Sequence, residues 1–301
     1  MFESLLAYEY YLASAQLALA MVGMGATLHV RDFLAIARTP TSFVVGYLSV
    51  LLLSPFIALG LTRVIPLEAG IAVGLLLIAA VPGGTMSNLL AYFARSNVAL
   101  SVALTAAATV TCLVSTPLVL NAFAGHLLPG QVVMPARAIA FDIFVALLLP
   151  LAAGMALGAR FDEHRQRIAK VSIRASLLTI LGLVVISAGS GRVEAGQYGL
   201  ISIAAMIALG LSLFVASVSI ARVAGFAHRD VVTIGLETCF RNGNLAVLIK
   251  ATVFPAIPGT PDPFADQVFF VALLYGMVGT AIAVPVTVAN RVWFVESAES
   301  P

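Results

Sequence analysis

Residues 81–88 read VPGGTMSN and interrupt an apolar segment that is otherwise long enough to cross a bilayer. Pro82 lacks a backbone donor, and Gly83 and Gly84 permit backbone conformations that are closed to other residues. A second interruption, ETCFRNGN at residues 237–244, lies in another apolar segment. Because lipid offers no hydrogen-bond partner, backbone that leaves a helix at membrane depth must be buried in protein or line a cavity. Such a pair of interruptions predicts the midplane binding site of a secondary transporter.

The composition is that of a polytopic membrane protein. Of the 301 residues, 61% are hydrophobic and only 10% are charged, whereas about 25% are charged in an ordinary soluble domain. Cys112 and Cys239 both lie in apolar segments and imply neither a disulfide framework nor a metal site. The sequence contains no Walker loop, H-E-x-x-H pair or Ser-His-Asp set, so it predicts no enzyme active site.

Pro, Gly and charge clusters divide the chain into nine predicted membrane spans, of which the third and eighth are interrupted. An outer N-terminus and a cytoplasmic C-terminus place eleven basic residues inside and three outside, so the positive-inside rule favours this orientation. Spans two to four and seven to nine then form an inverted repeat of helix, broken helix and helix. The short termini suggest a bacterial inner (plasma) membrane protein. The spans cover residues 9–28, 40–62, 69–94, 98–123, 134–159, 170–189, 198–222, 230–254 and 267–292.

Side chains with oxygen atoms follow the first break, at Thr85, Ser87 and Asn88. Together with freed carbonyl groups they would suit a small hard cation, and the N-terminus of the second half-helix would favour an anion. The same residue types also cap helices, which is an equally good interpretation of this stretch alone. Ser101 and Thr105 share one face of the fourth span. For an isolated pair, hydrogen bonds to the helix's own carbonyl groups are the simpler expectation.

The second break, within the eighth span, contains two charged residues, Glu237 and Arg241. A charge at the bilayer centre costs between about 2.5 and more than 10 kcal/mol, so such residues are normally paired, hydrated or functional. Their spacing of four also allows a buried structural ion pair. We expect Lys250 to extend towards the outer surface, and Asp142 to lie at a hydrated helix end, with a proton-relay role as the less favoured alternative.

Three stretches are similar to the bile acid:sodium symporter family: MVGMGATLHVRDF at 21–33, VPGGTMSNLLAYFARSNVALSVALTAAATV at 81–110 and ETCFRNGNLA at 237–246. With the spacing of the spans, the resemblance covers nearly the whole chain. It implies a single all-α transporter unit of about nine helices, in which two broken helices cross and substrate binds between a core and a panel domain. The implied core comprises residues 40–123 and 198–292, and the implied panel residues 9–28 and 134–189.

The resemblance implies that the family's first sodium site is retained and that the second is degenerate. The first site falls on Ser87, Asn88, Ser101, Thr105 and Glu237, and the family's substrate-side threonine and asparagine fall on Thr85 and Asn242, next to Asn244. The two glutamines of the second site correspond to Arg241 and Val50. A guanidinium accepts no hydrogen bond and stays protonated, so Arg241 cannot ligate sodium. It would replace the ion or contact the substrate, and Tyr275 and Gly276 replace a further polar pair of the family.

The predicted function is that of a secondary active symporter of an organic anion, coupled to sodium through a single site and working by movement of the core against the panel. No organic cofactor, nucleic acid or protein partner is implied. One alternative is a proton-coupled or uncoupled organic-anion transporter of the same fold, in which Glu237 or Asp142 titrates. Another is a membrane protein that binds its ligand without transporting it.

Overall fold

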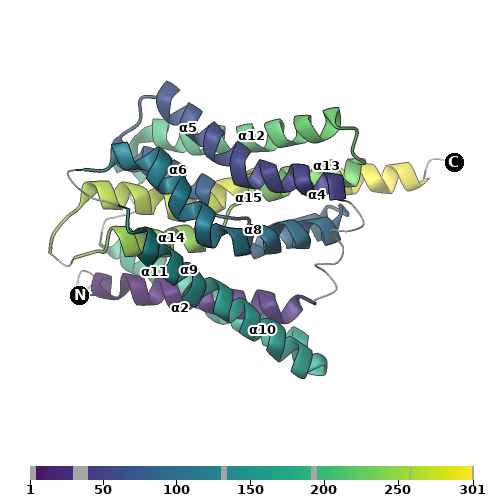
Figure 1. The fold of residues 1–301 in the computed structure, drawn as a ribbon, viewed down its shortest axis with the longest axis horizontal. Coiled ribbons are helices and arrows are strands. Elements are labelled where there is room, and N and C mark those ends of the chain that lie inside the picture. Colours follow the sequence, from purple (N-terminus) through teal and green to yellow (C-terminus); the bar gives the residue numbers. More distant parts are fainter. Residues whose placement is uncertain (1–4, 30–39, 130–133, 191–194, 258, 300–301) are drawn as a thin grey trace.

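A computed structural model describes residues 5–29, 40–129, 134–190, 195–257 and 259–299 (Figure 1). Within these ranges every regular element is a helix, and the single β-type pairing is an isolated bridge. The elements are η1 (Leu6–Tyr8), α2 (Glu9–Thr27), α4 (Pro40–Leu48), η3 (Ser49–Leu53), α5 (Ser54–Val64), α6 (Ala69–Ala80), α7 (Thr85–Phe93), α8 (Val98–Val119), η4 (Leu120–Ala124), η5 (Gly125–Leu127), α9 (Ala136–Ile143), η6 (Phe144–Leu148), α10 (Leu149–Arg160), η7 (Asp162–His164), α11 (Arg165–Gly189), α12 (Ala195–Val223), α13 (His228–Cys239), α14 (Gly243–Val253) and α15 (Pro263–Glu299).

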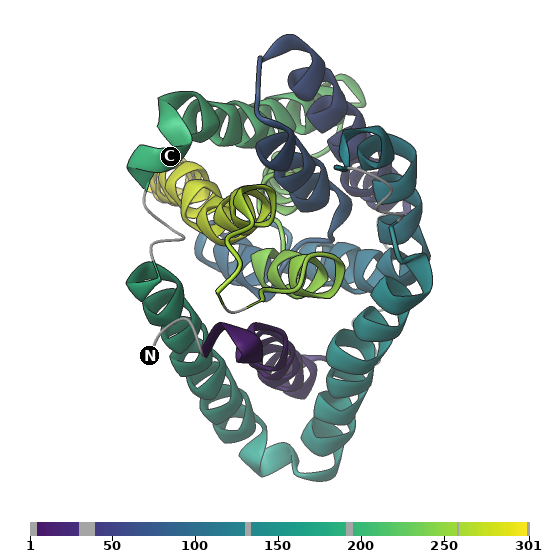
Figure 2. The same ribbon diagram turned by 90° about the vertical axis from the view of Figure 1, so that its left-hand side faces the viewer.

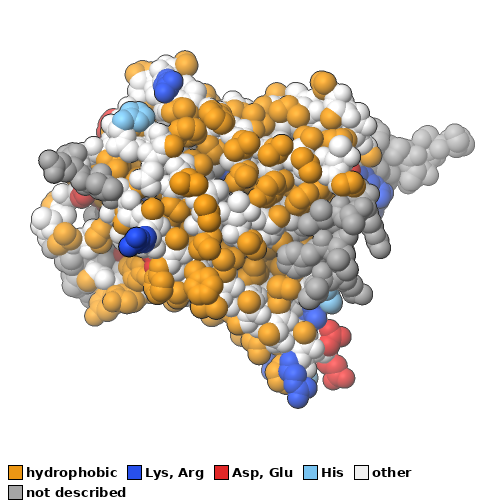
Figure 3. All heavy atoms as spheres, viewed as in Figure 1, with side chains coloured by type: hydrophobic (Ala, Val, Ile, Leu, Met, Phe, Trp, Pro, Cys, Tyr) orange, Lys and Arg blue, Asp and Glu red, His pale blue; other side chains and the backbone are white. Residues whose placement is uncertain are grey.

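Six helical segments of the described chain are long and apolar enough to cross a membrane. Figure 3 shows apolar side chains over the middle of one face, whereas charged side chains gather towards its two ends, as expected of a protein surrounded by lipid. The chain is therefore an integral membrane protein. The six segments are Pro40–Val64, Val98–Leu127, Ala136–Arg160, Asp162–Gly189, Gly196–Val223 and Pro263–Val292.

Two of these long segments contain a π-helical turn that directly precedes a proline-containing α-helix. The π-turn η3 leads into α5, whose second residue is Pro55, and η6 leads into α10, whose second residue is Pro150. Proline has no N–H to donate, so the helix widens locally instead of breaking. Each π-turn leaves backbone carbonyl groups free for other partners.

The helices α6 and α14 are short and lie inside the protein. Their 12 and 11 residues span about 18 Å or less, which is too short for a hydrocarbon core of about 30 Å. Residues 70–80 of α6 are all buried, and so are residues 245–251 of α14. The sequence of α6, AGIAVGLLLIAA, is apolar on every side, as a helix surrounded by other helices requires.

The helix α2 lies inside a V formed by α9 and α10 on one side and α11 on the other (Figure 2). Small residues bring α2 and α10 into backbone contact: a Cβ atom added at Gly158 would lie 2.6 Å from the carbonyl oxygen of Ala26, and one at Gly25 would overlap the carbonyl oxygen of Leu151. Close approach of backbones through glycine is the usual way in which membrane helices pack.

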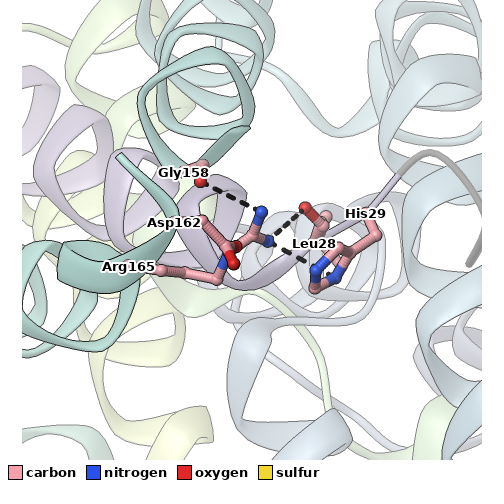
Figure 4. A network of polar contacts seen from close by, with 5 residues as sticks. All are labelled: Leu28, His29, Gly158, Asp162 and Arg165. Carbon is pink, nitrogen blue, oxygen red and sulfur yellow. Dashed lines mark hydrogen bonds and ion pairs between the residues drawn. The ribbon is translucent and has the colours of Figure 1, made fainter. Parts of the chain in front are cut away.

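The point of the V is fixed by Arg165 (Figure 4). Its guanidinium donates to the carbonyl oxygens of Leu28 (3.1 Å) and Gly158 (3.0 Å) and to the carboxylate of Asp162 (3.0 Å), and Nη1 lies 3.3 Å from Nδ1 of His29. One planar fork therefore joins the end of α2 to the α10–α11 turn, a task for which Arg is better suited than Lys.

Candidate functional site

The two predicted breaks are present, and each supplies the backbone partner of the other. The helix α6 ends at Ala80 and α7 begins at Thr85, while α13 ends at Cys239 and α14 begins at Gly243. The extended segments between them pair through an antiparallel bridge of Gly83 with Arg241, and the N–H of Asn242 donates to the carbonyl oxygen of Pro82 at 2.9 Å. Backbone that leaves the helix is thus satisfied by protein rather than by lipid.

Glu237, in the last turn of α13, is surrounded by hydroxyl groups of α8. Thr105 Oγ1 donates to Glu237 Oε2 at 2.9 Å and lies 3.1 Å from Oε1, and Ser101 Oγ also donates to Oε1. Both hydroxyls also contact Oδ1 of Asn88 in α7, at 2.8 Å from Ser101 and 3.2 Å from Thr105. Four of the five predicted sodium-site side chains therefore form one network of oxygen atoms, which is a donor set suited to a small hard cation.

The fifth predicted side chain, Ser87, also interacts with Glu237 and in addition bonds locally. Its hydroxyl donates to the carbonyl oxygen of Gly84 at 2.6 Å. A Cβ atom built on Gly83 would lie 2.6 Å from Glu237 Oε2 and 3.6 Å from Ser87 Oγ, so both side chains adjoin the same backbone position. Glycine at position 83 is what allows the carboxylate to approach the backbone this closely.

The network is buried everywhere except at Asn88. The side chains of Ser87, Ser101, Thr105 and Glu237 are at most 1% exposed, whereas Asn88 is half-buried and lines a cavity of about 1070 Å³. Asn88 is therefore the link between the buried carboxylate and the open space. The hydroxyl groups of Ser101 and Thr105 do not bond to their own helix, which corrects the simpler expectation for such a pair.

Arg241 forms no ion pair with Glu237 among the described contacts, although their spacing permits one. Its Nη2 donates instead to the carbonyl oxygens of Ala79 (2.6 Å) and Val50 (3.2 Å), and its Nε donates to that of Ile78 (3.3 Å). The side chain is only 2% exposed. A fixed cation thus occupies a cage of carbonyl oxygens beside the predicted sodium site.

These carbonyl groups are available because of two helix irregularities. The π-turn directs the N–H of Ser54 to Ser49, and Pro55 has no N–H, so the carbonyl group of Val50 is free to accept from Arg241. The others belong to the end of α6, where the last three carbonyl groups lack helical partners. Arg241 donates to those of Ile78 and Ala79, and the hydroxyl group of Thr116 donates to that of Ala80, whereas Leu77 still accepts from Val81 N.

The cavity is lined by helices from both sides of the molecule. Residues of α2 and α11, among them Gln16 and Ser176, form one wall, and residues of α7, α8, α14 and α15 form the other. Asn242 caps α14 by accepting from the N–H of Leu245 at 3.1 Å, and both it and the half-buried Asn244 line the cavity. The backbone of Thr85 begins α7, while its side chain lies outside the described part of the structure.

Tyr275 and Gly276, which the resemblance places at a polar pair of the family, have separate roles. The buried hydroxyl group of Tyr275 donates to the carbonyl oxygen of Cys239 at 3.0 Å and so caps the end of α13. Gly276 lines the cavity and leaves open space at its Cα. The resemblance placed a panel wall here, but its polar residues, among them Gln16 and Gln166, were not predicted individually, because they carry no local motif.

Two expectations about charged residues are wrong. Lys250 does not reach the surface: it is fully buried, and its Nζ lies 2.7 Å from Oε1 of Glu9. Asp142 does not lie at a hydrated helix end: it is 5% exposed and accepts hydrogen bonds from Tyr10, at 2.7 Å, and from Thr252. In both cases the partner comes from a distant helix, which removes the need for water.

Comparisons with known proteins agree with this architecture. Residues 15–196 match the model of the Sodium Bile acid symporter family. An uncharacterized sodium-dependent transporter, YocS, of Bacillus subtilis is 29% identical over 82% of this chain and 75% of its own length. The probable chloroplastic sodium/metabolite cotransporter BASS2 of Oryza sativa is 30% identical over 92% of this chain, but this chain spans only 64% of that relative.

The human ileal sodium/bile acid cotransporter is 30% identical over 89% of this chain and 75% of its own length. These relatives are transporters rather than enzymes, and sodium is the coupling ion of the family. With the family model matching more than half of the residues and the breaks meeting as described, the chain belongs to the sodium bile acid symporter family.

Proposed function

We propose that this chain is a secondary active symporter that uses one sodium ion to drive the transport of an organic anion. The observation that carries the proposal is the oxygen network around Glu237, which lies between two interrupted helices and contacts a large cavity through Asn88. Binding of an ion there would order both breaks at once. Ion binding and substrate binding would then favour the same conformation, which is the thermodynamic basis of coupling.

The proposed sodium ligands are Ser87, Asn88, Ser101, Thr105 and Glu237. Hydroxyl and amide oxygens can turn lone pairs towards an ion, and the carboxylate supplies the compensating charge. The two hydroxyl groups of α8 now donate to Glu237. On ion binding, they would rotate and direct their hydrogen atoms elsewhere. The helix backbone need not move for this exchange.

We propose that Arg241 takes the place of a second sodium ion. Its three bonds to carbonyl oxygens of Ile78, Ala79 and Val50 support this, because carbonyl oxygens are ligands of sodium-like cations and the end of α6 carries partial negative charge. Arg241→Gln would restore the family's residue. We expect the Hill coefficient for sodium to rise from about one towards two in this variant, and an equal Hill coefficient in both proteins would contradict the proposal.

An anionic substrate is supported by the cavity wall. None of the described residues that line the cavity is Asp or Glu, whereas Arg241 is among them. The N-termini of α7 and α14 both reach the cavity, at Gly84 and Gly243, and helix N-termini favour anions. We propose that Thr85, Asn242 and Asn244 contact the anionic group. The names of the relatives, which transport bile acids or metabolites with sodium, suggest an apolar or small organic body.

The proposed architecture has nine membrane helices with an inverted repeat, in which residues 40–123 and 198–292 form the core and residues 9–28 and 134–189 form the panel. The cavity lies between helices of both groups, as this division requires. With the N-terminus outside, the residues at the mouth of the cavity, such as His29 and Gln166, would lie on the cytoplasmic side of a bacterial plasma membrane. The structure then corresponds to an inward-facing state of an alternating-access cycle.

Purified protein in proteoliposomes would test the function. A thermal-shift screen of bile acids, sulfonates and small carboxylates, each in NaCl and in KCl, would first identify a sodium-dependent ligand. Uptake of that ligand should then follow an inward sodium gradient and disappear in Glu237→Gln. Uptake driven by a pH gradient without sodium would favour the proton-coupled alternative, and binding without uptake would favour a non-transporting protein.

A further inference from the structure

A second buried carboxylate lies on α13, seven residues and therefore two turns before Glu237. Asp230 is 7% exposed and accepts hydrogen bonds from two other helices: Ser42 Oγ in α4 donates to Oδ2 at 2.6 Å, and Asn97 Nδ2, at the start of α8, donates to Oδ1 at 2.7 Å. Asp230 itself lies in the first turn of α13. The N-termini of three helices thus meet at one negative charge, which their dipoles stabilise.

This carboxylate is not a second ion site of the same kind. In the Glu237 network the donors are hydroxyl groups, which have lone pairs that an ion can use. The donor to Asp230 Oδ1 is instead the amide N–H of Asn97, which has no lone pair for an ion. The amide oxygen of Asn97 does have lone pairs, but it already accepts from the backbone N–H of Leu100 at 3.1 Å. Asp230 therefore acts as a hydrogen-bond acceptor, and its role must lie in the residues that it fixes in place.

What Asp230 holds is the N-cap of the helix that carries Ser101 and Thr105. The first backbone bond of α8 runs from the N–H of Ser101 to the carbonyl oxygen of Asn97, at 3.1 Å. The amide oxygen of Asn97 caps the same turn, and Thr105 follows one turn later on the same face. A shift of Asn97 would therefore move both hydroxyl groups that contact Glu237.

The same residues fix α8 against α13. The N–H of Asn97 donates to Thr233 Oγ1 at 2.9 Å, and Thr233 lies between Asp230 and Glu237 on α13. Asn97 thus contacts Asp230 and Thr233 near the start of α13. Ser101, one turn further along α8, contacts Glu237, which lies further along α13 in the same direction. We propose that Asp230 is a positioning residue of the sodium site: through Asn97 it sets the register of α8 against α13 and so places Ser101 and Thr105 at Glu237. This rests on the proposed sodium site.

An exchange of the two side chains tests the proposal. In Asn97→Asp alone, the contact joins two carboxylates and the bond is lost, whereas in Asp230→Asn alone the amide oxygen can still accept from Asn97, so this variant removes only the charge. In the double variant, the new asparagine amide can donate to the new aspartate, which still caps α8, and Ser42 can still donate to the amide oxygen. All the hydrogen bonds of the natural pair are thereby restored with donor and acceptor exchanged.

The measurement is the sodium concentration that gives half of the maximal thermal shift of the purified, full-length protein, with choline chloride keeping the ionic strength constant. We expect Asn97→Asp to raise this midpoint at least tenfold, Asp230→Asn to raise it by a smaller factor, and the double variant to return it to within threefold of the natural protein. Ser42→Ala is the matched control, because it removes a bond to the same carboxylate from α4 rather than from α8. We expect it to leave the midpoint within twofold.

A lower melting temperature without sodium, combined with an unchanged sodium midpoint, would show a merely structural role and overturn the proposal. Raised midpoints that the double variant does not restore would overturn the route through Asn97. If Asp230→Asn alone does not fold, Asn97→Asp against the double variant measures the same effect. If the natural protein shows no sodium-dependent shift at all, the proposed sodium site itself fails, and the positioning role fails with it. If sodium shifts the melting temperature of the natural protein but the variants leave the sodium midpoint unchanged, only the positioning role is contradicted.

Discussion

Lys250 Nζ lies 2.7 Å from Glu9 Oε1, although the two residues are 241 positions apart in the sequence. Their side chains are 0% and 2% exposed, so the ion pair is fully buried between α14 and the first turn of α2. The hydrogen bonds of Asp142 to Tyr10 and Thr252 join α9 to the same two helices. The cavity, in contrast, reaches Thr27 and Leu28 at the other end of α2. One end of α2 is thus closed against α14, and the other end is open.

Removing one partner of this ion pair should be much worse than removing both. Lys250→Met leaves the Glu9 carboxylate buried without its ammonium partner, which typically costs about 3–5 kcal/mol of unfolding free energy. In Glu9→Gln with Lys250→Met no charge remains, and the loss should be smaller than in the single variant. Denaturant unfolding in mixed micelles would measure the coupling energy as a double-mutant cycle. Lys170→Met, at an exposed position of α11, is the control and should change stability by less than about 0.5 kcal/mol. A coupling energy close to zero would contradict the buried ion pair.

Replacing a hydroxyl group of the Glu237 network should weaken sodium coupling specifically. Thr105→Val keeps the shape of the side chain but removes the bonds to Glu237 and Asn88. We expect the sodium concentration for half-maximal uptake to rise about tenfold, which corresponds to about 1.4 kcal/mol. The control is Thr287→Val, because Thr287 is also buried but donates to its own helix at Ala283. Equal sodium dependence in both variants would argue against this site.

Adding one methyl group at the α2–α10 contact should destabilise the protein. At Gly25 a Cβ atom would overlap the backbone of Leu151 and would also lie 2.9 Å from the backbone nitrogen of Met155, and backbone cannot move aside cheaply. Gly25→Ala should therefore lower the melting temperature by several degrees. Gly182→Ala, within α11, meets no atom within 4 Å and should leave it unchanged or slightly raised, since Ala favours helix. Similar effects of the two substitutions would contradict the close packing.

Filling the cavity should affect the substrate and not the ion. Gly276→Leu adds a side chain at a cavity-lining position where an added Cβ meets nothing within 4 Å. We expect the KM for the organic anion to rise at least tenfold while the sodium midpoint of the thermal shift stays within twofold. Gly60→Leu is the control, because that position is equally open but does not line the cavity. Loss of sodium binding in Gly276→Leu would show that the two sites are not separate.

The breaks and their chemistry were predictable, because they depend on residues that are neighbours in the sequence. Pro82, Gly83 and Gly84 end one helix and Gly243 begins another, and both places are visible without a structure. The grouping of Ser101 and Thr105 with Glu237 was expected only from the family resemblance. Local rules favour bonds to the helix's own carbonyl groups, and nothing in the residues themselves specifies the partner helix.

The partners of the remaining charges could not be predicted. Lys250 resembles any lysine near the end of a membrane helix, and nothing close to it in sequence identifies Glu9 as its partner. The carbonyl group that Arg241 reaches at Val50 is free only because of a π-turn before Pro55, a feature of hydrogen-bond geometry that proline alone does not determine. Long-range pairing and local helix distortion are both consequences of packing, and a single sequence records packing only indirectly.

The proposed replacement of a second sodium ion by Arg241, in its cage of carbonyl oxygens, would also limit the work that transport can perform. A positive charge that belongs to the protein is never released on either side of the membrane, so it draws no energy from the sodium gradient. With one sodium ion accompanying a monovalent anion, the loaded step moves no net charge, so the membrane voltage contributes nothing. A tenfold sodium gradient, about 1.4 kcal/mol, could then concentrate the substrate only about tenfold. Such a carrier suits a compound that the cell consumes soon after entry rather than one that it must store.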